Sequence, residues 1–199
     1  MLPRLGPVDM KLSPKFDEAL LYAARLHADQ SRKVSGVPYI AHLLGVASIA
    51  LEYGANEEEA IGALLHDAIE DQGHGGRTRE EIRTRFGEAV LAIVEGCTDT
   101  DQDPKPPWRA RKETYIAHLG EASASVRLVS AADKLYNARA VLANYRTEGD
   151  AVWDRFNGKK DGTLWYYRSL VTAFRQHGAT PLVDELARVV DELNALAPS

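Results

Sequence analysis

The sequence has a single cysteine, Cys97, among its 199 residues. A disulfide framework within the chain and a cysteine-based zinc site are therefore both excluded. No apolar run reaches the roughly 18 residues that a membrane-spanning helix needs. The first residues, Met1 to Met10, also lack the continuous apolar stretch of a signal peptide. These absences make the cytoplasm the expected location, and we expect no membrane partner.

An excess of positive charge is missing as well. The formal net charge is −5, whereas nucleic-acid-binding domains usually carry a basic excess. We therefore expect no nucleic-acid partner, although a small phosphorylated substrate would need only a local group of cations. The remaining composition is ordinary for a globular protein, with 45% hydrophobic and 27% charged residues, which is enough for a sizeable core.

Turn and capping residues divide the chain into successive helical segments. Ser13-Pro14 is typical of a helix start, Gly54 of a helix end and Asn56 of the next N-cap. No five-residue stretch alternates strictly between apolar and polar residues, as a half-buried strand would. The sequence predicts an all-α protein, with helices over about 14–30, 40–53, 57–69, from 78 onward, 88–98, 108–119, 125–143, 164–177 and 181–195.

Short breaks between these segments favour antiparallel neighbours in one bundle-like domain. We expect residues 1–199 to form a single domain with a core over about 13–177, to which residues 178–199 add a C-terminal helix. The stretch 99–107, rich in aspartate and proline, is predicted to be a mobile loop. Lys159-Lys160, close to two glycines, is predicted to be an exposed or flexible basic loop. A homo-oligomer is compatible with the sequence.

Imidazole and carboxylate side chains stand at the ends of apolar segments that should be buried. Charged groups beside apolar faces are costly unless they are paired or bound to a metal. Two imidazoles and two carboxylates from three helices would form a mixed nitrogen and oxygen site that suits Mn²⁺, Fe²⁺ or Zn²⁺. The residues of this candidate site are His42, His66, Asp67 and Asp133.

Three blocks that contain these residues resemble those of a known family. They are residues 27–42, which end in Pro-Tyr-Ile-Ala-His; residues 66–71, His-Asp-Ala-Ile-Glu-Asp; and residues 133–137, Asp-Lys-Leu-Tyr-Asn. In this order they resemble the HD phosphohydrolases, especially the hydrolase domain of the RelA/SpoT alarmone enzymes and the stand-alone small alarmone hydrolases. The resemblance covers roughly residues 16–175. Leu43 departs from it, because the family usually has proline there, and residues 156–167 match no block.

The resemblance implies an HD-domain bundle of about ten helices that binds one divalent metal, Mn²⁺. It also implies a hydrolase of guanosine tetra- or pentaphosphate (ppGpp or pppGpp), the alarmones of the stringent response. The enzyme would remove the 3′-pyrophosphate, leaving GDP or GTP. Two alternatives stay open: an HD-type phosphatase acting on another nucleotide such as NADPH, and a module that binds a nucleotide without cleaving it.

The resemblance and the spacing of residues also suggest individual roles. A bound metal lowers the pKa of water towards neutrality, and we expect Glu70 to orient or deprotonate that water with support from Asp71. Either Tyr166 or Tyr167 could face the nucleotide, and spacing does not choose between them. The residues predicted to contact the substrate are Arg32, Lys33, Tyr39, Lys134 and Asn137.

Overall fold

A computed structural model describes residues 11–33, 35–100, 102 and 104–198. In this part of the chain the regular structure is helical, apart from one isolated antiparallel bridge between Ser31 and Pro38. The predicted all-α class is therefore confirmed. The helices are α1 (Pro14–Leu26), α2 (Ile40–Glu52), α3 (Glu57–Leu65), α4 (Ala68–Gln72), the 3₁₀ helix η1 (His74–Gly76), α5 (Arg77–Phe86), α6 (Glu88–Cys97), α7 (Trp108–Leu119), α8 (Ala124–Glu148), the 3₁₀ helix η2 (Gly149–Arg155), α9 (Lys159–Gln176) and α10 (Pro181–Leu196).

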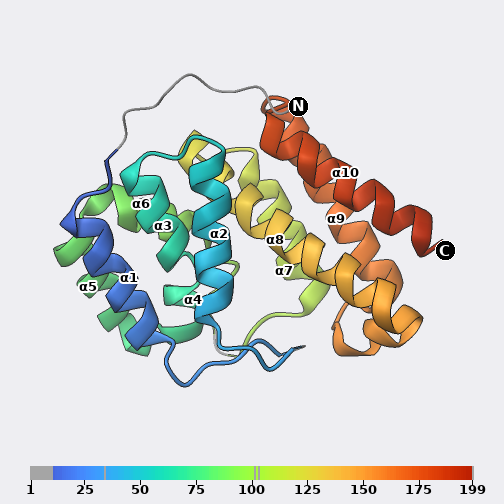
Figure 1. Ribbon diagram of the computed structural model, residues 1–199, viewed down its shortest axis with the longest axis horizontal. Helices are drawn as coiled ribbons and strands as arrows, with labels where there is room; N and C mark the ends of the chain where they lie inside the picture. The colour runs from blue at the N-terminus through green and yellow to red at the C-terminus, as the bar shows by residue number, and fades with distance from the viewer. Residues whose placement is uncertain (1–10, 34, 101, 103, 199) are drawn as a thin grey trace.

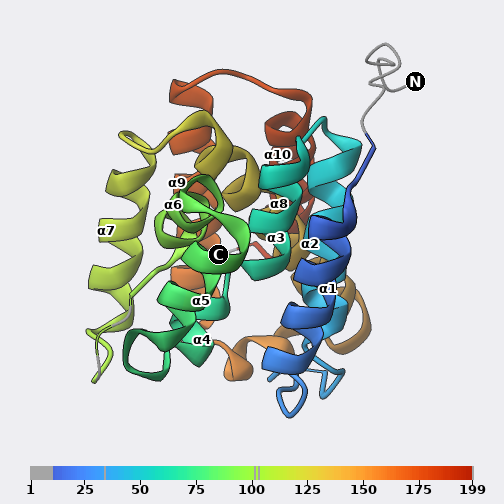
Figure 2. The ribbon, with the colours of Figure 1, turned by 90° about the vertical axis from the view of Figure 1, so that its left-hand side faces the viewer.

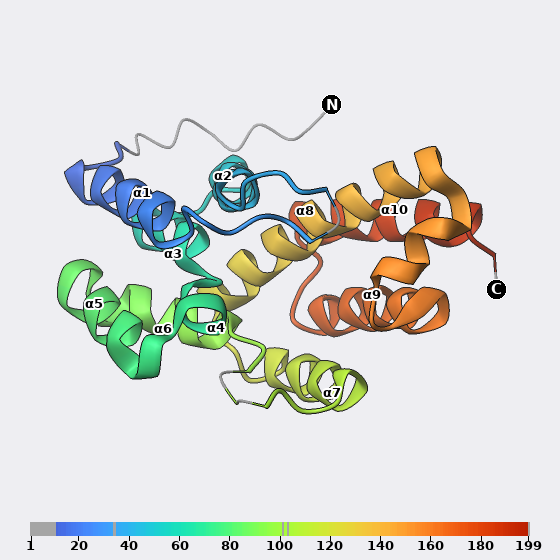
Figure 3. The same cartoon turned by 90° about the horizontal axis from the view of Figure 1, so that it is seen from below.

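Helix α8 is the central element of the fold. It is 25 residues long and runs from the part of the molecule that holds α1, α3, α5 and α6 towards the part that holds α9 and α10 (Figures 1 and 3). Helices α2, α3, α6, α9 and α10 all contact it. Figure 2 looks at the molecule from the α1 side, with α7 at the edge opposite α1. Side chains on α8 can therefore meet residues from most of the chain.

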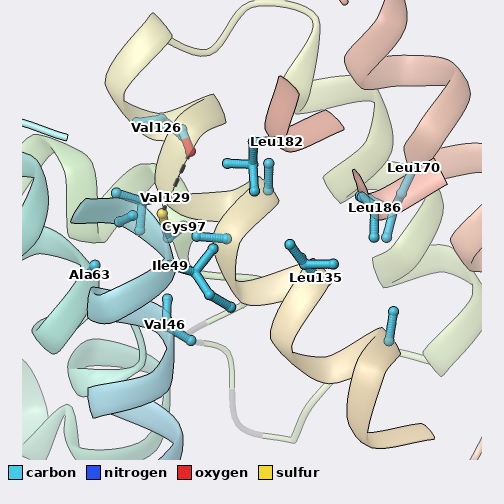
Figure 4. Close-up of a cluster of buried hydrophobic side chains, with 14 of the residues drawn as sticks. Val46, Ile49, Ala63, Cys97, Val126, Val129, Leu135, Leu170, Leu182 and Leu186 are labelled. Carbon is cyan, nitrogen blue, oxygen red and sulfur yellow. Dashed lines mark hydrogen bonds between the residues drawn. The ribbon is translucent and has the colours of Figure 1, made fainter. Parts of the chain in front are cut away.

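The apolar core follows α8. Figure 4 shows Leu135 of α8 between Ile49 of α2 on one side and Leu170 and Leu186 of α9 and α10 on the other, with Val129 of α8 on the side of Ile49. Cys97 belongs to this core, and burial raises the pKa of its thiol to about 11. The thiol is therefore protonated near neutral pH. Among the described helices, none combines the length and the apolar character that crossing a membrane would require.

Most of the predicted helices are confirmed, but the predicted helix 57–69 is two helices. Helix α3 ends at Leu65, α4 begins at Ala68, and His66-Asp67 forms the turn between them. The Nδ1 atom of the His66 ring donates to the carbonyl of Ala63 over 2.8 Å. In an uninterrupted helix that carbonyl would accept the amide of Asp67. The prediction of one continuous helix is therefore wrong at the two residues that matter most for the site.

The predicted basic loop at Lys159-Lys160 is also wrong, because both lysines begin α9. Acidic side chains from the preceding segment hold them there. The ammonium of Lys159 lies 3.4 Å from Oδ1 of Asp154, and that of Lys160 lies 3.5 Å from Oδ1 of Asp150. These charge pairs are contacts between η2 and α9 that local sequence spacing did not reveal.

Substitutions in helix α10 test whether the C-terminal segment shares the main core. Leu186 is 0% exposed on this helix, whereas Leu196 is 45% exposed. We expect Leu186→Ala to lower the free energy of unfolding by about 2–5 kcal/mol, in a single cooperative denaturant transition. The matched change Leu196→Ala should stay within about 0.5 kcal/mol of the parent protein. A separate early transition for α10 would contradict the single-domain prediction.

Candidate metal centre

Three buried side chains from three helices meet at one point. His42 comes from the first turn of α2, His66 from the end of α3 and Asp133 from the middle of α8. The Nε2 atoms of the two histidines are 3.2 Å apart, and Oδ1 of Asp133 lies 3.4 and 3.6 Å from them. All three ligand atoms lie within 4.8 Å of one another, so these residues could hold a divalent metal ion.

Asp67 lies beside this group of three. Its Oδ2 atom is 3.3 Å from Nε2 of His42 and 3.0 Å from Nε2 of His66. The same oxygen accepts a hydrogen bond of 2.6 Å from the hydroxyl of Tyr39. Asp67 is not in the set whose ligand atoms all lie within 4.8 Å of one another. Its place as a fourth ligand therefore stays a prediction.

The electrostatics of the donor set favour a cation. Burial alone would raise the pKa of Asp133, but Lys134 and the two imidazoles outweigh burial and hold that pKa well below its usual range. Burial lowers the pKa of His42, and the carboxylates of Asp67 and Asp133 do not outweigh that effect. For His66, the carboxylates of Asp67 and Asp133 overcome burial and raise the pKa. Two carboxylates thus stabilise positive charge between the imidazoles, which is what a divalent cation requires.

Hydrogen bonds orient the donors towards a common point. The bond from His66 Nδ1 to Ala63 keeps the proton on that nitrogen and leaves Nε2 available for coordination. The Tyr136 ring packs on His42, with ring centroids 5.0 Å apart. This packing needs Gly45, because a Cβ atom there would overlap the Tyr136 ring. Gly45 of α2 therefore allows α8 to approach closely enough for Tyr136 to pack on His42.

Four of the five predicted substrate residues lie around the donors. Asn137 donates to Oδ1 of Asp133 over 2.5 Å and accepts a 2.6 Å hydrogen bond from the guanidinium of Arg32. The ammonium of Lys134 lies 2.6 Å from Oδ2 of Asp133. Tyr39 reaches the site through its bond to Asp67. These contacts link the loop before α2 to the ligand on α8.

Tyr39 is held by an aromatic ring, a cation and a carboxylate of the protein itself. Its ring stacks on His27 with centroids 5.3 Å apart, and the Arg32 guanidinium lies 5.8 Å from its centroid. Burial and the charges of Asp67 and Asp71 raise the pKa of Tyr39, so its hydroxyl keeps its proton and donates. The observed contacts support a role in positioning Asp67.

The predicted acid–base pair lies on α4, and its hydrogen bonds join it to Asp99, Lys105 and Gln30. Glu70 accepts from the backbone amide of Asp99 over 3.2 Å and from the ammonium of Lys105 over 2.8 Å. Asp71 is exposed and accepts from the side chain of Gln30 over 2.6 Å. The last predicted residue, Lys33, is exposed on the loop before α2. No contact of these three residues tests their predicted roles.

Sequence reasoning missed a group of residues next to the donors. Asp99 was assigned to a mobile loop, yet its side chain is only 8% exposed and pairs with Arg111 and Lys112 of α7. Tyr166 and Tyr167, between which spacing did not choose, are both buried. The signal in the sequence was the Arg-Lys pair at 111–112, but nothing local indicated that α7 folds back towards α8.

Comparison with known proteins identifies the class. The sequence profile described as HD domain matches residues 19–164, which is more than half of the chain. The chain therefore belongs to the HD-domain family, as the three blocks predicted. Its all-α fold and its histidine–aspartate cluster agree with that assignment.

Its curated relatives narrow this class. The guanosine-3′,5′-bis(diphosphate) 3′-pyrophosphohydrolase MESH1 of Xenopus tropicalis is 42% identical over 125 residues, which cover 61% of this chain and 66% of that protein. The Drosophila melanogaster protein of the same name is 33% identical over 138 residues, covering 68% and 74%. The guanosine-3′,5′-bis(diphosphate) 3′-pyrophosphohydrolase of Aquifex aeolicus is 35% identical, but only 18% of its length is matched. The match to the Xenopus protein thus spans just under two thirds of that relative.

Solved structures agree with the fold. A metazoan orthologue of SpoT that hydrolyses ppGpp superposes with a TM-score of 0.75 at 27% identity, covering 94% of this chain and 99% of that one. The protein lmo0812 from Listeria monocytogenes EGD-e gives a TM-score of 0.67 at 30% identity, covering 76% and 97%. The first match includes nearly all of the present chain, so the two proteins share the arrangement of their helices.

The hydroxyl of Tyr39 provides a test of the metal centre. Removing a hydrogen bond to a metal ligand typically costs about 10–100-fold in metal affinity. We expect Tyr39→Phe to weaken divalent-metal binding by this amount in titrations of metal-free protein. Tyr136→Phe is the matched control, because the Tyr136 hydroxyl donates to the carbonyl of Ala41 at 3.4 Å and not to a proposed ligand among the described residues. Equal metal affinities for the two variants would remove Tyr39 from the centre.

Proposed function

We propose that the chain is a metal-dependent hydrolase that removes the 3′-pyrophosphate of ppGpp or pppGpp. The observation that carries the proposal is the meeting of His42, His66 and Asp133, with Asp67 in contact with both imidazoles. Relatives named for this activity support the choice of substrate. A nucleotide substrate also agrees with the cytoplasmic location expected from the sequence.

The metal we propose is Mn²⁺, held by the two imidazoles and by the carboxylates of Asp67 and Asp133. Mixed imidazole and carboxylate ligands suit this cation. When bound, such a cation lowers the pKa of water so that a nucleophile is available near neutral pH. Hydrogen bonds orient two of these proposed ligands. Nδ1 of His66 donates to the carbonyl of Ala63, and the hydroxyl of Tyr39 donates to the carboxylate of Asp67.

Glu70 and Asp71 are the groups that we propose for proton transfer. Both belong to α4, which begins directly after Asp67. Glu70 and Asp71 therefore follow a proposed metal ligand closely in the chain. In the structure Glu70 is paired with Lys105. A carboxylate side chain can act as a general base towards water. Gln30 would position Asp71 for its supporting role, because the Gln30 amide donates a 2.6 Å hydrogen bond to the Asp71 carboxylate.

Arg32, Lys33, Lys134 and Asn137 are the residues we propose for substrate binding. Arginine can grip a phosphate with two parallel hydrogen bonds, and lysine acts as a point charge. The Arg32 guanidinium is already directed towards the donors by Asn137. The balanced reaction is attack by water on the phosphorus attached to the 3′ oxygen. That P–O bond breaks, the 3′ oxygen takes up a proton and pyrophosphate leaves.

Product analysis tests this proposal directly. Metal-free protein would be reloaded with Mn²⁺ and incubated with ppGpp, pppGpp and NADPH, with phosphorus NMR to identify products. Release of pyrophosphate and GDP or GTP is the expected result. Orthophosphate from NADPH alone would instead identify a phosphatase. Tight nucleotide binding with no product over hours would identify a binding module, and either result overturns the proposal.

Glu70→Gln separates proton transfer from metal binding. General acid–base groups typically contribute about 10²–10⁴-fold to rate, so we expect a loss of this order in kcat. Metal content, measured by elemental analysis, should be unchanged, because the described hydrogen bonds of Glu70 go to the amide of Asp99 and to Lys105. The exposed residue Glu88 offers the matched control Glu88→Gln. A wild-type rate for Glu70→Gln would show that Glu70 has no part in proton transfer.

A further inference from the structure

His27 is a buried histidine that takes no part in the proposed reaction steps. It is the C-cap residue of α1 and is 2% exposed. Its Nδ1 atom lies 2.7 Å from Oε1 of Gln30, while its Nε2 atom is buried without a hydrogen-bond partner among the described residues. A buried polar atom without a partner costs free energy that an apolar side chain in the same place would avoid. The bond from Nδ1 is therefore the contact that distinguishes histidine from a packing residue here.

The side-chain amide of Gln30 connects His27 to helix α4. Its nitrogen donates to Oδ2 of Asp71 over 2.6 Å, and its oxygen also accepts from the amide of Gln72 over 3.0 Å. Because an amide oxygen only accepts, Nδ1 of His27 carries a proton and donates. A reversed amide would place its oxygen against the Asp71 carboxylate and its nitrogen against two donors. The contacts with His27 and Gln72 thus keep the donating end of Gln30 on Asp71.

His27 and Gln72 hold the Gln30 oxygen from different places. Gln72 belongs to α4 itself and follows Asp71 directly, so it moves with that helix. His27 is tied to α1, because its backbone amide donates to the carbonyl of Ala23 over 3.1 Å. The ring of His27 is also buried in the interior, whereas Asp71 is exposed. His27 is therefore the fixed end of a hydrogen-bonded bridge that runs through Gln30 to Asp71.

The ring of His27 reaches α4 by a second route. It stacks on the ring of Tyr39, with centroids 5.3 Å apart and planes inclined by 21°. The Tyr39 hydroxyl donates to Oδ2 of Asp67 over 2.6 Å, and Asp67 is the N-cap residue of α4. The backbone joins the two routes, since the amide of Asp71 donates to the carbonyl of Asp67 over 2.9 Å. One imidazole thus contacts the supports of both aspartates.

We propose that His27 is a positioning residue for residues 67–71, the acid–base segment of the proposed site. Its Nδ1 proton fixes Gln30 at one end of this segment, and its ring fixes Tyr39 at the other end. Glu70 lies between the two ends and takes its position from both. The role in catalysis rests on the proposed function, whereas the bridge rests on the contacts themselves.

Two substitutions separate the two contacts of the histidine. His27→Phe keeps a ring for Tyr39 and removes the donor to Gln30. We expect it to lower kcat about 5–20-fold, because the amide that bonds the Asp71 carboxylate loses its orientation. KM and Mn²⁺ affinity should be unchanged. The measurement uses the full chain at saturating Mn²⁺, with the nucleotide that the product analysis shows to be cleaved.

His27→Asn should give the reverse pattern. The amide nitrogen of asparagine is as many bonds from Cβ as Nδ1 of histidine, so Gln30 keeps a donor and kcat stays close to that of the wild type. Mn²⁺ affinity should fall about 2–10-fold, because Tyr39 loses the ring on which it stacks. General damage to the fold would lower both quantities in both variants. An equal loss of kcat in the two variants therefore overturns the proposal.

Controls and a check of folding accompany these variants. The exposed residue His118 offers the matched controls His118→Phe and His118→Asn, which should leave kcat and Mn²⁺ affinity unchanged. The melting temperature would establish that each variant is folded. If His27→Phe does not fold, comparison of Gln30→Met with His27→Asn gives the same test of kcat, because only the first loses the bond to Asp71.

A double-mutant cycle shows whether His27 acts through Gln30. Gln30→Met keeps the length of the side chain without its amide and should lower kcat as much as His27→Phe. The two changes together should cost no more than Gln30→Met alone, because they remove the same bridge. Losses that multiply would mean that the residues act independently, which overturns the proposal. Gln176→Met, at the exposed end of α9, is the matched control.

Hydrogen exchange of the Gln30 side-chain amide distinguishes failure of the bridge from failure of the proposed function. NMR on the chain loaded with diamagnetic Zn²⁺ measures this exchange without turnover. Slow exchange in the wild type and His27→Asn, with about 5–20-fold faster exchange in His27→Phe, supports the bridge even if the wild type does not cleave ppGpp. Equal exchange in all three proteins overturns the bridge. Cleavage of ppGpp with equal kcat in all three overturns the positioning role, and the proposed function then stands.

Discussion

Two imidazole rings with their Nε2 atoms 3.2 Å apart, and two carboxylates against them, are the constraint on which this structure depends. Such a group is unfavourable inside an apolar bundle unless a positive charge lies within it. The surrounding helices nevertheless bring these four side chains together. Asp133 interrupts an otherwise apolar stretch at the centre of α8, and the turn between α3 and α4 delivers His66 and Asp67. The site therefore determines local backbone structure that apolar packing alone would not favour.

The turn between α3 and α4 is the clearest example. Adjacent residues in an α-helix point about 100° apart, since each turn takes 3.6 residues. From a regular helix the side chains of His66 and Asp67 would therefore leave in different directions. The bond between the His66 ring and the Ala63 carbonyl ends α3 at this place and fixes the ring at the same time. One side chain thus acts as both a helix terminator and an oriented donor.

The sequence predicted the helical class, most of the helices, and the donors His42, His66 and Asp133. The class and most of the helices are confirmed because caps, glycines and apolar runs are local signals. The structure also brings the three predicted donors together, and the signal for them was charge beside apolar runs. The break at His66-Asp67 was missed, since the donor that replaces the Asp67 amide at the Ala63 carbonyl is the ring of His66 itself. The positions of Asp99 and Lys112 were missed for another reason. They depend on how α7 packs beside α8 and α9, which is a tertiary property without a periodic signature.

The hydrogen bonds from Arg32 to Asn137 and from Asn137 to Asp133 couple the loop before α2 to the donors on α8. An anion that draws the guanidinium away leaves the Asn137 carbonyl without its donor, and the amide can then reorient against Asp133. By thermodynamic linkage, any change in cation affinity that follows must be matched by an equal change in anion affinity when the cation is present. The two ligands are therefore not independent occupants. The amide of Asn137 is the side chain that joins the two binding regions.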